Sequence, residues 1–124
     1  MLIQFSVENF LSIKDKVVLS LLASKDNEHP EHLIMDGNKS YLKSAVIYGA
    51  NASGKSNVLN AFWFMVNYVL TSHNQQLHKT IGRSPFKFDP ETPTRPSSFE
   101  VIFTTEGIRY AYGFSVTDKA VTEE

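Results

Sequence analysis

The chain has 124 residues and a formal net charge of −1 at pH 7, and its length fits one domain or part of one. Hydrophobic residues make up 42% of it, which excludes a disordered tail, and the balance of 12 basic against 13 acidic residues argues against a polybasic nucleic-acid binder. The chain has no cysteine, which excludes disulfides, thiolate metal sites and a thiol nucleophile.

Two strands are predicted at the N-terminal end. Leu2–Glu8 alternates between apolar and polar side chains, as a half-buried strand does, and residues 16–22 are largely β-branched and aliphatic. Residues 9–15 between them contain turn formers. The pattern therefore predicts an antiparallel hairpin.

A polar segment follows the hairpin, and an apolar run comes after it. Residues 24–40 contain Pro30 and Gly37, and we predict a loop with a short helical turn near residues 31–35. Residues 42–48 rise into an apolar run that stops at a glycine. Such a run is typical of a buried central strand.

A helix is predicted from Lys55 to about Thr71. Its apolar side chains recur at helical spacing, at Leu59, Phe62, Trp63, Val66, Val69 and Leu70. We interpret residues 62–65 as core packing against the sheet rather than as a ligand site, although Trp63 or Phe64 could also face a further lobe.

Nothing in the sequence indicates a membrane segment. The most apolar stretch, residues 58–70, is shorter than the roughly 20 residues that a bilayer span needs. The N-terminus has no basic region followed by an apolar run, so it does not resemble a signal peptide. We therefore expect a cytoplasmic protein with no membrane partner.

The last part of the chain reads as a loop followed by a hairpin. Residues 73–98 contain four prolines and form a predicted loop that could include a short strand over residues 86–88. Residues 99–103 and 108–116 then alternate between apolar and polar side chains around a Thr-Glu-Gly turn. This pattern predicts a second hairpin.

Two features of this region have a functional alternative. The stripe of Tyr110, Tyr112 and Phe114 is interpreted as the buried face of a sheet, with stacking on single-stranded bases as the alternative. The loop also carries four basic residues, which are Lys79, Arg83, Lys87 and Arg95. We interpret them as solvated, with contact to a phosphate backbone as the alternative.

The run His29-Pro30-Glu31-His32 resembles a metal cluster. His29, Glu31 and His32 lie close together, but Pro30 disrupts the spacing of a helical zinc pair. We interpret this cluster as a solvated loop and His73 and His78 as surface residues.

The strongest motif is a glycine-rich loop between the predicted central strand and the helix. Gly49-Ala50-Asn51-Ala52-Ser53-Gly54-Lys55-Ser56 satisfies the P-loop pattern. Glycines let the backbone wrap closely around a phosphate chain, and the following helix aims its positive end at the same place. Lys55 would reach the β- and γ-phosphates, and the Ser56 hydroxyl would ligate Mg²⁺.

The loop and its neighbours resemble a known group of ATPases. Residues 49–57, GANASGKSN, resemble the P-loop of ABC-type ATPases of the SMC, RecF and OLD kind, and residues 7–13 resemble their turn between the first two strands. A closer match is to the AAA ATPases linked to abortive phage infection. The start MLIQFSVENFLSI, the segment PFKFD and the hairpin strands SFEVIF and GIRYAYGFSV resemble blocks of that family in the same order.

The resemblance implies a set of ligands and partners. It implies an ATP-binding head with Mg²⁺ that pairs with a second head and sandwiches two ATP molecules. The cradle residues carried over by position are Gly49, Asn51, Ala52, Ser53, Gly54, Lys55, Ser56 and Asn57. Asn51 would lie near the γ-phosphate, and Ser56 would hold Mg²⁺.

One position departs from the family pattern. The family usually has Arg, a residue that lies near the nucleotide, where this chain has Leu11. Lys14 or Lys16 could substitute for it.

Other motifs of an ABC-type ATPase are missing. Leu33–Asp36 resembles a Walker B strand only remotely, and no signature stretch or glutamine loop is found. We therefore expect residues 1–124 to be the N-terminal part of an ATPase head, inactive alone, with a C-terminal lobe as its partner. The expected fold is α/β, the N-terminal lobe of a P-loop NTPase. It would have a mixed sheet with antiparallel edge strands, one main helix after the P-loop and a C-terminal hairpin.

Three functional hypotheses follow. The first is an anti-phage ATPase that drives an effector nuclease. The second is a RecF- or SMC-like ATPase of DNA repair or chromosomes, with DNA as its partner. The third is a non-enzymatic module that only binds nucleotide or docks on a longer ATPase.

Overall fold

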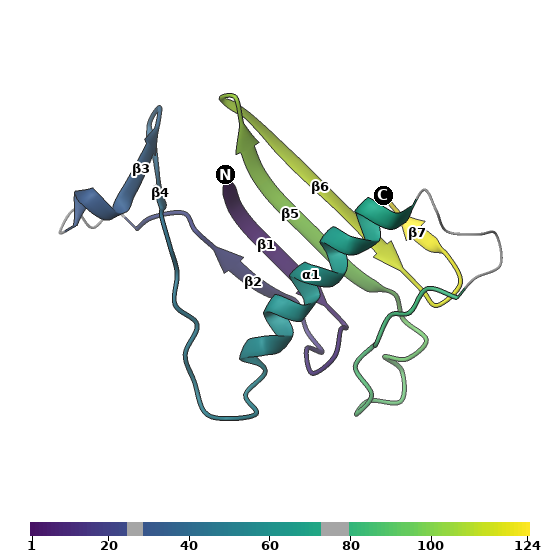
Figure 1. The fold of residues 1–124 in the computed structure, drawn as a ribbon. Coiled ribbons are helices and arrows are strands. Elements are labelled where there is room, and N and C mark those ends of the chain that lie inside the picture. The colour runs from purple at the N-terminus through teal and green to yellow at the C-terminus, as the bar shows by residue number, and fades with distance from the viewer. Residues whose placement is uncertain (25–28, 73–79) are drawn as a thin grey trace.

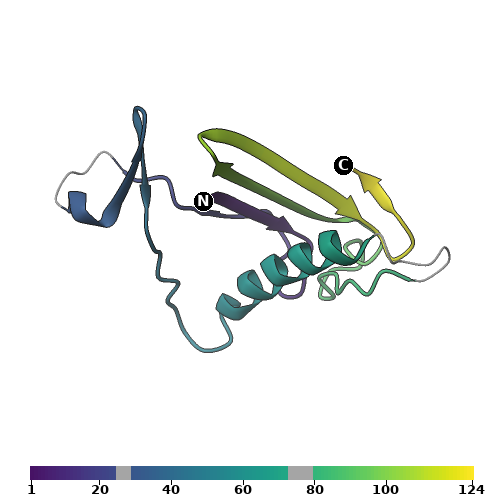
Figure 2. The same cartoon turned by 45° about the horizontal axis from the view of Figure 1, so that its top comes forward.

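The computed structural model describes residues 1–24, 29–72 and 80–124, and it is built around one antiparallel sheet (Figure 1). The sheet has five strands in the order β2-β1-β5-β6-β7. Their bounds are Leu2–Glu8 for β1, Val17–Ser20 for β2, Ser97–Thr105 for β5, Ile108–Val116 for β6 and Val121–Glu123 for β7. The helix α1, Lys55–Thr71, lies across one face of this sheet (Figures 1 and 2).

A two-stranded hairpin stands apart from the sheet and the helix (Figures 1 and 2). It consists of β3, Leu33–Asp36, and β4, Lys39–Leu42, and follows a 3₁₀ helix at Pro30–His32. Backbone hydrogen bonds tie it to the segment after β2, since Leu42 N donates to Leu21 O and Ala23 N donates to Ser40 O. The expected short helical turn is present and begins one residue early, and residues 33–40 of the expected loop belong to the hairpin, while residues 25–28 lie outside the described residues.

The strongest sequence patterns correctly predicted their elements. The helix spans Lys55–Thr71, and the first hairpin pairs Val7 with Val17 and Phe5 with Leu19. The second hairpin pairs nine residues of β5 with nine of β6. Its two-residue turn places Glu106 and Gly107 at positive φ, which is the turn geometry that matches the twist of antiparallel strands.

The prediction of a central strand over residues 42–48 is wrong for the described structure. Strand β4 ends at Leu42, and one further backbone hydrogen bond follows it, from Lys43 N to His32 O in the 3₁₀ helix. The following Val46 and Tyr48 are 83% and 90% exposed. An apolar run becomes a strand only where a neighbouring strand pairs with it, and no described strand lies beside this one.

Two smaller predictions also fail. Residues 86–88 form no strand, because this segment is held by side-chain hydrogen bonds instead of a ladder. Every strand pairing among the described residues is antiparallel, so these residues form only the antiparallel part of the expected mixed sheet. The short strand β7 was not predicted.

The core lies between α1 and the sheet. The helix buries Ala61 and Met65, which are four residues apart and therefore on one face. Rings from the helix meet rings from the strands, as in the edge-on contact of Phe5 with Phe62 at 5.1 Å and the contact of Tyr68 with Phe114 at 5.1 Å. This packing fixes the helix, and with it the loop that precedes the helix, against β1 and β5.

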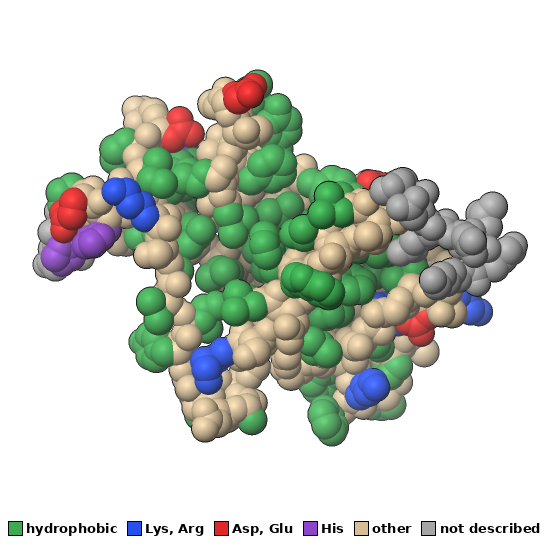
Figure 3. All heavy atoms as spheres, viewed as in Figure 1, with side chains coloured by type: hydrophobic (Ala, Val, Ile, Leu, Met, Phe, Trp, Pro, Cys, Tyr) green, Lys and Arg blue, Asp and Glu red, His purple; other side chains and the backbone are tan. Residues whose placement is uncertain are grey.

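The C-terminal half of α1 leaves part of the sheet uncovered. An apolar groove of about 510 Å³ runs between α1 and the β5–β6 hairpin. Hydrophobic side chains are exposed there over the helix and the strands (Figure 3). Among the described residues, no helix is long and apolar enough to cross a membrane.

Candidate functional site: the glycine-rich loop at the start of α1

The glycine-rich loop turns sharply into α1. Gly54 is the residue before the helix and has φ +91°, a conformation that residues with a Cβ rarely adopt. A Cβ at Gly54 would lie 2.9 Å from the Ser12 hydroxyl oxygen, so there is also no room for one. Ala52 is left-handed as well, with φ +63°. The chain therefore turns tightly at both residues.

The loop surrounds a small open cavity. The cavity has a volume of about 300 Å³ and is lined by Ala52, Ser53, Gly54, Lys55, Ser56 and Asn57. These are six of the eight residues that the sequence indicated. No side-chain hydrogen bond caps the start of α1; Asn57 N donates to Gly54 O at 2.9 Å, and the N–H groups of Lys55 and Ser56 before it are left for a ligand. The positive end of the helix dipole lies at the same place.

The other two predicted residues, Gly49 and Asn51, do not line the cavity. The Lys55 ammonium folds back and donates to Gly49 O at 2.8 Å and to Ala50 O at 2.7 Å. No ion pair of the described residues involves Lys55. Asn51 is exposed. Among the described residues, the Lys55 ammonium therefore contacts carbonyl oxygens and no carboxylate.

The turn after β1 lies directly against this loop. Asn57 Nδ2 donates to the Ser12 hydroxyl at 2.7 Å, and the same hydroxyl blocks the Cβ position of Gly54. The residue before it, Leu11, has φ +51° and donates its N–H to Ser84 O. The N-terminal hairpin therefore supports the shape of the loop.

Leu11 uses its side chain for packing. It lies against the hydrophobic core cluster that contains Phe10 and Met65. Both lysines that could substitute for the family's arginine form ion pairs in this structure. Lys14 Nζ pairs with Asp89 at 2.7 Å, and Lys16 Nζ pairs with Glu100 at 3.3 Å.

The Lys14–Asp89 pair makes the stability of the chain depend on pH. The hydrogen bond from Lys14 and the backbone N–H of Glu91 hold the pKa of Asp89 below its usual value. A carboxylate with a lowered pKa stabilises the fold above its unfolded pKa, and this is lost as the pH falls through the folded value. We expect Asp89→Asn to lower the urea midpoint slightly at pH 7 and to have no effect at roughly pH 2.

Lys14→Met serves as the matched variant for this pair. Since the same bond raises the pKa of Lys14, its contribution is present at neutral pH and is lost only as the pH rises through the raised value. The double variant should cost no more at pH 7 than either single variant. Equal effects of Asp89→Asn at both pH values would contradict the assignment.

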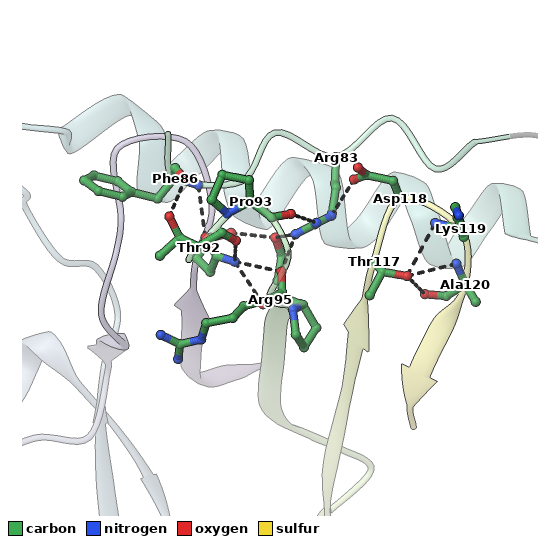
Figure 4. A network of polar contacts seen from close by, with 12 residues as sticks. Arg83, Phe86, Thr92, Pro93, Arg95, Thr117, Asp118, Lys119 and Ala120 are labelled. Atoms are coloured by element: carbon green, nitrogen blue, oxygen red, sulfur yellow. Dashed lines mark hydrogen bonds and ion pairs between the residues drawn. The ribbon is translucent and has the colours of Figure 1, made fainter. Parts of the chain in front are cut away.

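A buried polar network organises the loop between α1 and β5, and the sequence reading missed it (Figure 4). Arg83, interpreted above as a solvated loop charge, has a side chain that is only 1% exposed. Its guanidinium donates to Asp118 Oδ1 and Pro93 O, and also to Arg95 O and Ser97 Oγ.

Asn9 completes the network from the other side. Its amide donates to Thr92 O, Arg95 O and Pro96 O, and its Oδ1 accepts from Phe86 N. Asn9 is 2% exposed and has φ +53°. Asparagine tolerates this left-handed conformation better than most residues. An asparagine directly after a predicted strand is the one sequence signal that could have indicated the turn.

The two other basic residues of the loop that the structure describes, Lys87 and Arg95, lie at the surface. Arg95 pairs with Glu8 at 3.3 Å, and Lys87 is exposed. Lys79, like His73 and His78, lies outside the described residues.

The aromatic residues divide between core and surface. Met65 and Phe114 are buried, and Phe62, Phe64 and Tyr112 are partly buried against the core, as the packing interpretation predicted. Trp63 and Tyr110 are exposed by 69% and 43%.

The remote resemblance of Leu33–Asp36 to a Walker B strand has no support in the structure. This segment is β3 in the separate hairpin, where Met35 is 70% exposed. None of the residues that line the loop cavity is acidic.

Comparison with known proteins identifies a family. Residues 44–124 match the family described as "AAA domain, putative AbiEii toxin, Type IV TA system". No curated protein and no solved structure matches the chain. The match covers more than half of the chain, including the glycine-rich loop, α1 and the β5–β6 hairpin. The chain therefore belongs to this family of AAA domains.

Proposed function

We propose that the chain is the Mg²⁺-ATP-binding N-terminal lobe of an ABC-type ATPase head in the SMC, RecF and OLD group. The observation that carries the proposal is the loop cavity, which combines a helix start without a side-chain cap, left-handed backbone at Ala52 and Gly54, and a Lys55 ammonium that forms no ion pair among the described residues. The AAA family match, whose members generally bind ATP with Mg²⁺, supports it.

The residues present fit a magnesium-bound phosphate chain. Gly54 permits the tight turn into the helix, because its φ of +91° and the nearby Ser12 hydroxyl both disfavour a side chain there. Backbone N–H groups and the Lys55 ammonium supply positive potential, and the Ser56 hydroxyl is exposed next to them. Nucleotide binding would require Lys55 to leave the Gly49 and Ala50 carbonyls and turn to the β- and γ-phosphates. Bound ATP would supply the phosphoanhydride whose cleavage drives such heads.

Hydrolysis needs an acidic group that this cavity lacks. An ATPase holds Mg²⁺ and orients the attacking water with acidic or polar groups from a second element. Because no acidic residue lines the loop cavity, we infer that the C-terminal lobe of the head and a second head supply these groups. The chain alone is then expected to bind nucleotide and not to turn it over.

The biological role that we propose is anti-phage defence in the cytoplasm, with the head coupled to an effector nuclease. The order of the four sequence blocks supports it, and so does the family described as an AbiEii toxin-like AAA domain. Direct DNA binding has less support on the loop of residues 80–96, because Arg83 is buried and Arg95 is paired with Glu8.

Titration of Mg²⁺-ATP into the chain and its Lys55→Ala variant tests the proposal. Loss of one charge-assisted contact costs about 1.5–3 kcal/mol, so we expect the variant to bind roughly 10- to 100-fold more weakly. The matched control is Lys87→Ala, which removes an exposed lysine away from the cavity and should bind as the parent does. Equal affinities of the parent and Lys55→Ala would overturn the proposal.

A further inference from the structure

We propose that His29, Glu31 and His32 form a binding site for one divalent transition-metal ion of the zinc type. One ligand atom from each side chain lies within 4.8 Å of the other two. The purple histidine side chains lie on the surface beside an acidic one, at the left end of the molecule in Figure 3. This site is remote from the glycine-rich loop in sequence and does not depend on ATP binding.

The backbone explains why the two imidazoles meet. The residues Pro30–His32 form a 3₁₀ helix, with His29 as the residue before it. Such a helix has three residues per turn, so residues three apart lie above one another. His29 and His32 are three apart, and their ring centroids are 5.7 Å apart. Pro30, which disrupts the α-helical spacing of a zinc pair, favours this tighter turn by fixing its own φ.

The carboxylate of Glu31 lies between the two rings. Its Oε1 is 3.2 Å from His29 Nδ1 and 3.5 Å from His32 Nε2. Two ligands at about 2.1 Å from a tetrahedral ion are roughly 3.4 Å apart, so both distances already match a shared ion. Two histidines and one glutamate are a donor set that zinc uses, with the fourth position left to water.

The charge of the site also suits a cation. The nearby Lys43 ammonium donates to the Glu31 carbonyl oxygen at 2.7 Å and not to its carboxylate. Among the described residues, the ion-pair partners of Glu31 Oε1 are the two imidazoles.

The turn is anchored to the hairpin that follows. Lys43 holds it twice, through its ammonium on Glu31 O and through its backbone N–H on His32 O at 3.2 Å. The three side chains are 62–72% exposed and need only small rotations to close on an ion. A bound ion would link the start and the end of the turn.

Zinc titration into the full chain without a purification tag tests the site. We expect one Zn²⁺ per chain, with a dissociation constant on the order of micromolar. Losing one of three protein ligands should raise the dissociation constant roughly tenfold or more in His32→Ala and in Glu31→Gln. His78→Ala, which removes an imidazole from a different part of the chain, should leave the affinity unchanged.

A second measurement locates the ion. Addition of Co²⁺ should broaden the imidazole proton resonances of His29 and His32 in the nuclear magnetic resonance spectrum before those of the other two histidines. Circular dichroism checks that the exposed substitutions leave the fold intact. The proposal is overturned if Zn²⁺ binds no more tightly than roughly 100 µM, or if His78→Ala weakens binding as much as His32→Ala.

Discussion

Replacing Asn9 with alanine is expected to lower the free energy of unfolding by about 3–5 kcal/mol, because each buried polar group that loses its partner costs about 1–3 kcal/mol. The variant deprives three carbonyls of their shared donor and leaves Phe86 N without its acceptor. It also places alanine at a φ of +53°, which asparagine tolerates better. Urea denaturation followed by circular dichroism measures the loss.

Asn60→Ala is the matched control for this variant. Asn60 is exposed on α1, so the same substitution there should change the free energy of unfolding by less than about 0.5 kcal/mol. A similar loss in both variants would mean that the buried amide of Asn9 does not organise the loop.

Replacing Arg83 with methionine is the second change with a large expected effect, a loss of about 2–5 kcal/mol. Methionine is apolar and unbranched, but it leaves Pro93 O and Ser97 Oγ without the guanidinium donors, while Arg95 O keeps only its bond from Asn9. Asp118 contributes less to the loss, since it is 59% exposed and water can replace its partner. The expected fall in melting temperature is roughly 10 °C.

Arg95→Met provides the control for Arg83→Met. The Arg95 side chain is exposed and makes one ion pair with Glu8, so its removal should cost less than about 1 kcal/mol. Because Arg83 and Asn9 both donate to Arg95 O, this carbonyl loses all its side-chain donors only in the double variant, and the double loss should differ from the sum of the single losses. Additive losses would contradict a shared network.

The sequence predicted the elements whose patterns are local. The helix Lys55–Thr71 and the two hairpins formed by β1–β2 and β5–β6 follow from apolar periodicity and turn residues that lie within each element. The glycine-rich loop was also readable, because its residue types and spacing are dictated by the backbone geometry. The structure places six of its eight residues around one cavity.

The sequence could not predict what depends on distant partners. The apolar residues 42–48 read as a central strand, but a strand needs a neighbour, and none of the described strands pairs with them. Arg83 read as a surface charge, because its partner Asp118 is 35 residues away. His29 and His32 read as solvated and are exposed, but periodicity could not show the 3₁₀ turn that brings their rings to 5.7 Å.

The pairing of β1 with β5 has a consequence for how the chain folds as it is made. Phe5 pairs with Val101 and Val7 with Phe99, so the first strand finds its central partner only after residues 99–101 have been synthesised. At translation rates of about 5–20 residues per second, β1 waits roughly 5–20 s for β5 to emerge. Of the described elements that pack against the apolar face of β1, the helix α1 emerges first, with Phe62 against Phe5. The sheet around β1 therefore assembles only after α1 has been made, and the core closes when β6 follows with Phe114 and Val116.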